Sequence, residues 1–213
     1  MMMGKGVDTT GKTLKVAKPQ SARSAKEKVS KMQKIALNEV CELFSGFPLG
    51  SKDFAEAGNL SVIQLRDVDR NSIRLNDLQS TDKVLATKRK LLNYGDVLFK
   101  ARGPRLEAIN LPLKPENTIA TNGFIILRPQ SQVHPSYIAW LLNNMNFGRI
   151  IQQTHVIQSI SLRQLAEIEV PIPDRETQSN IVDMQREIEA GRKLANQYFD
   201  AASKILRGQI FST

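Results

Sequence analysis

Residues 159–182 read SISLRQLAEIEVPIPDRETQSNIV and lead into the longest helical pattern of the chain. In this stretch Asp174 is a good helix N-cap, and Glu176 suits the positive end of a helix dipole. Because no proline follows, we predict one uninterrupted helix to about Gln209. At ~1.5 Å per residue this helix is ~50 Å long, which exceeds the width of a small domain. Part of its apolar face therefore needs a partner.

The apolar residues of this helix recur at alternating spacings of three and four, as in a coiled-coil seam. Small residues within the seam favour close approach of another helix, and we interpret the helix as a docking arm. The alternative is an ordinary C-terminal helix packed back on its own domain. The predicted partner-facing residues are Ile181, Met184, Ile188, Gly191, Ala195, Tyr198, Ala202 and Ile205.

The length and composition limit the classes of protein to which the chain can belong. A length of 213 residues allows one domain of ordinary size plus an appendage. The single cysteine, Cys41, excludes an internal disulfide and a Cys-rich zinc site, and neither His134 nor His155 stands in metal-ligand spacing with it. No run approaches the ~20 apolar residues of a membrane span, and no signal peptide is recognisable. We expect a soluble cytoplasmic protein with no membrane contact, no metal and no cofactor.

The net charge of +9 is unevenly distributed along the chain. Residues 1–34 carry a net charge of +7, which leaves only +2 for the remainder. Residues 1–32 are therefore predicted to be a basic tail that is disordered when alone. Two interpretations stay open for this tail: a non-specific phosphate-binding arm, or a segment that only aids solubility.

A second concentration of positive charge lies between Lys88 and Arg105, where six basic residues stand against the single acid Asp96. Concentrated charge is typical of a nucleic-acid-binding face, although an ordinary solvated charge run is the alternative. Arginines there suit either guanine or phosphate, and the sequence does not separate these roles. The residues predicted to contact nucleic acid are Arg66, Lys88, Arg89, Lys90, Lys100, Arg102, Gly103, Arg105 and Asn122.

Local patterns predict the remaining elements. Residues 25–43 have a helical pattern, with Val29, Met32, Ala36, Val40 and Leu43 on one face. Strands are predicted over residues 60–65 and 97–99, and over residues 119–129 with an Asn-Gly turn or bulge at residues 122–123. A second helix is predicted from Pro135 to about Gln153. In the second helix Trp140 and Phe147 are interpreted as packing residues rather than base-stacking platforms, and His155 as a polar loop residue.

Four passages of the chain resemble the specificity subunits of type I restriction-modification systems. They are residues 35–46, the Asn93-Tyr94-Gly95-Asp96-Val97-Leu98 segment with Arg102-Gly103, residues 121–129, and residues 160–182 with Glu176-Thr177-Gln178. The last passage is the most specific, because it is similar to that family's link between a target recognition domain and a conserved helix. The resemblance covers residues ~33–209 and leaves the basic tail outside.

The resemblance implies an α+β fold. Residues 33–173 would form a DNA target recognition domain with a small, twisted, mostly antiparallel β-sheet and flanking helices. Residues 174–213 would form the long coiled-coil helix for dimerisation or methyltransferase docking. It also implies partners: double-stranded DNA, methyltransferase subunits and, through them, restriction subunits, in a bacterial or archaeal cytoplasm.

The chain departs from the family in one respect. A typical member carries two recognition domains, whereas this sequence has one and resembles a half-subunit. Two copies that pack their long helices antiparallel would form a closed twofold dimer with a recognition domain at each end. We therefore expect a homodimer that recognises an inverted repeat.

The sequence disfavours an independent enzyme. A methyltransferase needs a glycine-rich cofactor turn after a strand and an Asn/Asp-Pro-Pro-aromatic segment, and neither is present. A nuclease needs clustered carboxylates for a metal, and Asp67 and Asp69 lie in a predicted turn without partners. The stronger competitor is an interaction protein, or decoy, that binds methyltransferase subunits through the helix without reading DNA.

Overall fold

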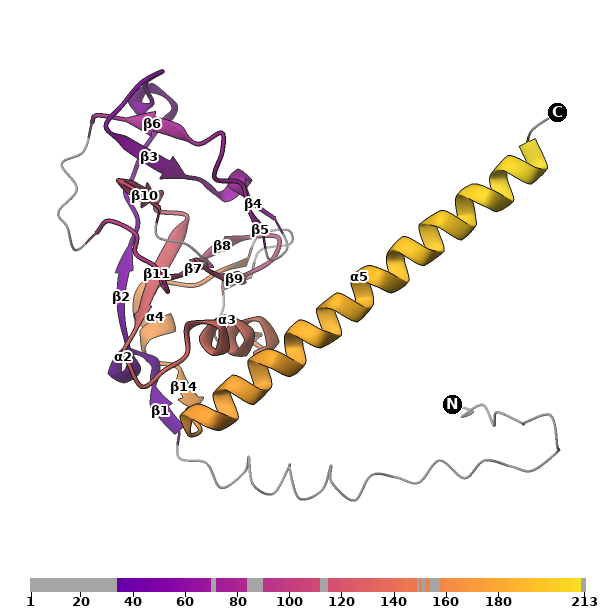
Figure 1. Cartoon of the computed structure of the whole chain (residues 1–213). Coiled ribbons are helices and arrows are strands. Elements are labelled where there is room, and N and C mark those ends of the chain that lie inside the picture. Colours follow the sequence, from indigo (N-terminus) through magenta and orange to yellow (C-terminus); the bar gives the residue numbers. More distant parts are fainter. Residues whose placement is uncertain are drawn as a thin grey trace. The chain divides into compact units, whose positions relative to one another are not determined.

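The computed structural model describes residues 34–69, 72–83, 90–111, 115–148, 150, 152–153 and 158–211. The chain divides into Met1–Gln33 and Lys34–Thr213, and every described residue belongs to the second unit. The predictions made for residues 1–32, Lys88, Arg89 and His155 therefore lie outside the described residues. The second unit is α+β, as predicted from the resemblance (Figure 1).

A four-stranded antiparallel sheet lies at the centre of the domain, in the order β2 (Cys41–Ser45), β11 (Phe124–Pro129), β7 (Val97–Lys100) and β9 (Glu107–Asn110). Successive residues of its strands enter different core clusters. Val97 and Phe99 of β7 belong to one cluster, and Leu98 belongs to the other. Because side chains alternate across a strand, the two clusters cover opposite faces of the sheet. The short buried strand predicted over residues 97–99 is confirmed.

Helices cover the first face of the sheet. The first core cluster joins α2 (Leu37–Val40), α3 (Pro135–Asn144) and α4 (Leu162–Ala166) to β7 and β11. Beside them β1 (Lys34–Ala36) pairs antiparallel with β14 (Glu169–Pro171). The hydroxyl of Tyr137 in α3 donates a hydrogen bond to the Pro171 carbonyl over 2.8 Å, and burial raises the pKa of Tyr137 to about 12.

Short strands cover the second face. β3 (Leu60–Ile63) pairs in parallel with β10 (Thr118–Ala120) and antiparallel with β6 (Gln79–Thr81). The 3-10 helix η2 (Leu65–Asp67) leads into a hairpin of β4 (Val68–Asp69) and β5 (Ser72–Ile73). A further small sheet contains β12 (Gln152–Gln153), β13 (Gln158–Ser159) and β8 (Arg102–Gly103), in that order. The 3-10 helix η1 (Ser51–Asp53) follows β2 and precedes β3 along the chain.

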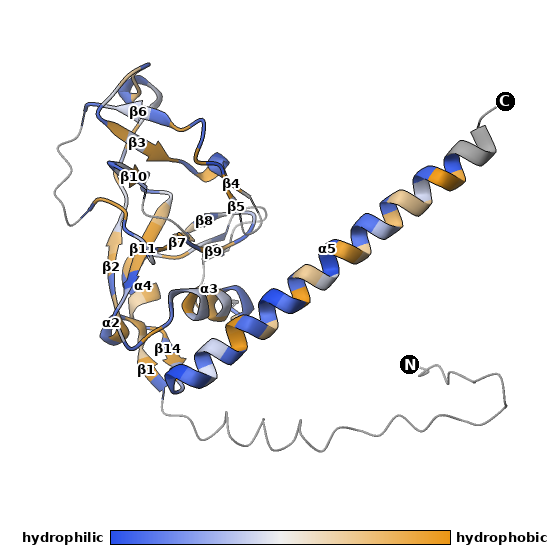
Figure 2. Cartoon of the chain, viewed as in Figure 1, coloured by the Kyte–Doolittle hydropathy of each residue, from blue (hydrophilic) through white to orange (hydrophobic). Residues whose placement is uncertain are grey.

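The long helix α5 (Arg175–Phe211) is continuous, as predicted. The Asp174 carboxylate accepts a hydrogen bond from the Thr177 N–H over 2.8 Å, which confirms it as the N-cap and lowers its pKa. Val182 is buried in the first core cluster and Ile181 packs against that cluster. Between Met184 and Leu206 the large apolar side chains of α5 are exposed. Figure 2 shows α5 leading away from the domain after its first turns, so this part of the helix does not pack back on the domain.

A buried polar joint fixes the start of α5 to the domain. The side chain of Gln178 is fully buried, and its carbonyl oxygen accepts from the His134 N–H over 2.7 Å. Its amide nitrogen donates to the carbonyls of Pro173 at 2.8 Å and Gln132 at 3.3 Å. Since a buried amide without partners is costly, these three bonds specify how the first turn of α5 sits beside α3.

Two sequence predictions need correction. The helical pattern over residues 25–43 gives only the four-residue α2 among the described residues, because residues 34–36 pair with β14 and residues 41–45 pair with β11. The helix predicted over residues 135–153 ends at Asn144, and the next residue, Met145, is extended. Phe147 then packs beside Phe99, with ring centroids 5.7 Å apart, so its predicted packing role is confirmed.

Candidate nucleic-acid interface

The turn Thr121–Gly123, between β10 and β11, is the point where the predicted DNA-binding segments meet. The Phe47 N–H donates to the Ala120 carbonyl over 2.8 Å, and the Asn122 N–H donates back to the Phe47 carbonyl over 2.8 Å. On the other side the Ala101 N–H donates to the Gly123 carbonyl over 2.9 Å. Backbone hydrogen bonds therefore bring the segment after β2 and the end of β7 to one turn.

A close approach at Gly123 brings a further segment to the same turn. A Cβ atom at this position would lie 2.8 Å from Cγ of Leu65, which is closer than real Cβ contacts. A larger residue at this position would require the Leu65 side chain to shift, so glycine permits this close contact between η2 and the turn. Because Arg66 follows Leu65 directly, this contact places Arg66 in the same neighbourhood as Asn122.

The loop after β7 holds two exposed arginines on a defined backbone. In β8, Arg102 pairs with Ser159 of β13 and Gly103 pairs with Gln158. Gly103 has φ 138°, a conformation that side chains rarely adopt. Both Arg102 and Arg105 are exposed. The pairing with β13 and the backbone conformation of Gly103 fix the path of this loop. The side chains of Arg102 and Arg105 stay exposed on it.

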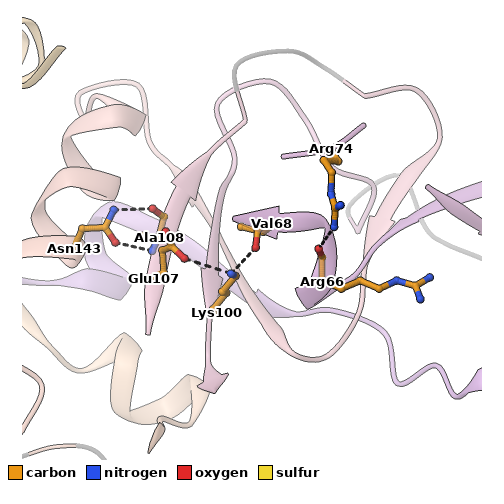
Figure 3. Close-up of polar contacts among 7 residues, drawn as sticks. All are labelled: Arg66, Val68, Arg74, Lys100, Glu107, Ala108 and Asn143. Atoms are coloured by element: carbon orange, nitrogen blue, oxygen red, sulfur yellow. Dashed lines mark hydrogen bonds and ion pairs between the residues drawn. The ribbon is translucent and has the colours of Figure 1, made fainter. Parts of the chain in front are cut away.

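Lys100 differs from these arginines, because its ammonium group is turned inward. The Nζ atom donates to the Val68 carbonyl over 2.6 Å and lies 3.3 Å from the Glu107 carboxylate (Figure 3). Only 16% of the Lys100 side chain is exposed. The charge that the sequence suggested for DNA contact is therefore engaged within the domain.

The remaining predicted residues lie at the surface. Arg66 has 60% of its side chain exposed and its Nε lies 3.8 Å from the Asp67 carboxylate. Lys90 is exposed, with Nζ 5.0 Å from the ring centroid of Phe47. Asn122 is exposed in the turn itself. Contacts of Leu65, Phe47 and Ala101 at the turn thus bring the segments that carry Arg66, Lys90 and Arg102 close to Asn122.

Sequence reasoning missed three residues of this site. Arg74 of the segment after β5 is exposed, and its guanidinium donates to the Arg66 carbonyl. Phe47 makes two backbone hydrogen bonds at the turn, with Ala120 and Asn122. Glu107 is the partner of Lys100. The cross-strand position of Lys100 and Glu107 follows from the β7–β9 register, which no local pattern reveals.

Within the described ranges, no group of three or more His, Cys, Asp or Glu side chains is arranged to hold a metal ion. Burial raises the pKa of the Cys41 thiol to about 12, so this cysteine is a packing residue and not a nucleophile. Among the residues described, no helix is both long and apolar enough to cross a membrane.

The family described as "Type I restriction modification DNA specificity domain" matches residues 29–197. The chain belongs to this family. The match includes the central sheet, the turn Thr121–Gly123 and the first part of α5. The specificity subunits of this family are in general non-catalytic. No curated protein shows significant similarity to the chain.

Two solved structures have the same fold. One is a chain from a structure of complex assembly and conformational transition of the type I R-M system, with 22% identity, a TM-score of 0.64 and coverage of 84% of this chain. The other is the HsdS subunit from Thermoanaerobacter tengcongensis, with 19% identity, a TM-score of 0.57 and coverage of 78%. This chain spans 44% and 39% of their respective lengths.

Proposed function

We propose that this chain reads one half of a bipartite double-stranded DNA sequence and directs methyltransferase subunits and, through them, restriction subunits to that site. The observation that supports the proposal is that backbone segments next to exposed basic residues are hydrogen-bonded at the turn Thr121–Gly123, in a member of the specificity family. The chain itself supplies recognition, and its partners supply the chemistry.

The arrangement around the turn suits sequence reading. Arg102 and Arg105 are carried on a loop fixed by β13, and Arg66 is carried on η2. Guanidinium groups can bind guanine edges or phosphates bidentately, and the exposed amide of Asn122 can bind adenine. Rigid presentation lowers the entropy lost on binding and so favours discrimination between sequences.

The exposed face of α5 supports an assembly. Met184, Ile188, Tyr198 and Ile205 are 63%, 47%, 71% and 63% exposed, and Gly191 has open space around it. Ile181 packs on the domain's own core, so the free seam begins at Met184. We propose that a second copy packs antiparallel on this seam. The 22 residues from Met184 to Ile205 extend over about 33 Å, which is comparable to one turn of DNA at ~34 Å.

Reversal of charge at the turn tests the proposal. The double variant Arg102→Glu, Arg105→Glu should lower affinity for a selected target by at least about a hundredfold, because each removed charge-assisted contact is worth ~1.5–3 kcal/mol. Its control is Lys34→Glu, Lys193→Glu, which makes the same change in net charge at exposed positions of β1 and α5. Equal affinities for both variants, with assembly intact, would exclude this surface and favour the decoy function.

A further inference from the structure

The hairpin of β4 and β5 carries Arg66 and Arg74 on its two flanks but is small. Its register contains only the pairs Val68–Ile73 and Asp69–Ser72. A two-stranded hairpin of this size is unstable alone, so contacts with the rest of the domain must hold it. Val68 is buried in the second core cluster and Ile73 packs against it, and a polar contact of this kind is the bond from Lys100 to the Val68 carbonyl, at 2.6 Å.

The inward position of Lys100 is set by its partner across the sheet. Glu107 of β9 lies directly opposite Lys100 of β7, and the Lys100 Nζ lies 3.3 Å from its carboxylate. Only 12% of the Glu107 side chain is exposed. An ammonium group with two acceptors in a partly buried site would lose both bonds by turning toward a phosphate. Lys100 therefore favours its internal partners over DNA.

The strand that carries Glu107 is held in turn by two hydrogen bonds from a side chain of α3. The side chain of Asn143 donates to the Ala108 carbonyl over 2.8 Å and accepts from the Ala108 N–H over 2.8 Å (Figure 3). Because β9 is the edge strand of the central sheet, Asn143 occupies the place of a further strand. The acceptor of Lys100 thus belongs to a strand that is fixed on both sides.

At the other end of this network the arginines are ordered by the hairpin. The Arg74 guanidinium donates to the Arg66 carbonyl, and the Arg74 N–H donates to the Asp67 carbonyl over 2.9 Å. Figure 3 shows the Arg66 side chain directed away from these contacts. Both bonds are accepted by backbone carbonyl oxygens, so the Arg66 guanidinium takes no part in them and stays exposed.

We infer that Lys100 is a positioning residue for DNA reading: it fixes the β4–β5 hairpin so that Arg66 is presented beside the turn Thr121–Gly123, and it does not contact DNA. The functional part of this inference rests on the proposed function. The mechanical part, that Lys100 holds the hairpin, is a property of the free protein.

Hydrogen exchange of the full chain without DNA tests the mechanical part. Lys100→Met removes the ammonium and keeps most of the side-chain volume. We expect peptides covering residues 66–74 to exchange at least about tenfold faster, while peptides from β11 are unchanged. Lys34→Met, at an exposed position in β1, is the control with the same charge change. Unchanged exchange at residues 66–74 would overturn the inference. If Lys100→Met fails to fold, the double variant Lys100→Met, Glu107→Gln, which also lacks a donor toward Val68 but leaves no unpaired carboxylate, replaces it.

A double-mutant cycle in DNA affinity tests the functional part. Arg66→Gln should weaken binding to a selected target by about tenfold, and Lys100→Met should weaken it through the same contact. The double variant should then bind within about threefold of Arg66→Gln alone. A loss equal to the product of the two single losses would show that Lys100 contacts DNA independently and would overturn the inference. If none of these variants alters affinity while exchange still accelerates, the DNA surface is wrong and the mechanical role stands.

Discussion

The buried carboxylate of Asp96 fixes the entry to the central strand β7. It is fully buried and accepts two hydrogen bonds from the Arg128 guanidinium, both 2.8 Å long, and one from the Asn93 N–H at 2.8 Å. Arg128 also donates to the Leu91 carbonyl over 2.9 Å. The bond to Asp96 is the main reason why the pKa of Arg128 is raised. These hydrogen bonds connect the turn Asn93–Asp96 to Arg128 of β11.

Removal of this carboxylate should destabilise the domain strongly. We expect Asp96→Ala to lower the free energy of unfolding by about 3–5 kcal/mol, because it leaves Arg128 without its buried partner. Denaturant unfolding measures the change. Glu167→Ala is the matched control: its pair with Arg163 spans 2.9 Å but is solvent-exposed, so the expected loss is below ~1 kcal/mol. Equal losses in the two variants would contradict a structural role for Asp96.

His134 makes the joint between α3 and α5 sensitive to pH. Its Nδ1 caps α3 by accepting from the Ser136 N–H over 3.2 Å, which requires an unprotonated nitrogen. Burial, assisted by Arg175 and Arg186, lowers the pKa of His134 below its ordinary value of ~6.5. A lowered folded pKa means that this stability is present above pH ~6.5 and is lost as pH falls through the folded value.

The variant His134→Ser isolates this effect, because serine caps the helix at every pH. We expect the melting temperature of the native chain to fall relative to that of His134→Ser as pH decreases from ~7 to ~5. Carboxylates such as Asp53 and Asp174 also have lowered pKa values, but they are common to both proteins and cancel in the difference. Parallel curves over this range would contradict the capping role of His134.

At the scale of elements, the seam of α5 can be tested without damage to the domain. Ile188→Glu should abolish assembly, because it places a carboxylate in an apolar helix interface, while the unfolding temperature of the domain stays unchanged. Sedimentation velocity measures the assembly. Lys193→Glu, five residues further along on the face opposite the seam, is the control and should assemble normally. Assembly of Ile188→Glu with native mass would refute the seam.

Local signals sufficed for some elements and not for others. The N-cap at Asp174 and the absence of proline predicted α5, and the apolar run at residues 97–99 predicted β7. The strands β1 and β2 were missed because their identity depends on pairing with β14 and β11, at least 80 residues away in sequence. The same limit applies to the site. Local charge identified the basic loop, but it did not reveal that Lys100 turns inward toward Glu107 and Val68.

At the scale of the whole molecule, the symmetry of the proposed assembly would determine the symmetry of the proposed DNA target. Two copies joined antiparallel through α5 are related by a twofold axis, so their turns must face half-sites in inverted orientation. The length of the seam then sets a fixed spacer. Selection of a spaced direct repeat would contradict the twofold arrangement.

The central claim is that this chain reads DNA sequence, and selection from a random duplex library tests it most directly. The full chain, alone and with its methyltransferase partner, is incubated with the library at near-physiological salt, and the retained DNA is sequenced. We expect enrichment of two short half-sites in inverted orientation at a fixed spacing. Absence of enrichment in both samples, with retention that collapses as salt rises, would show that only phosphates are bound and would contradict sequence-specific recognition.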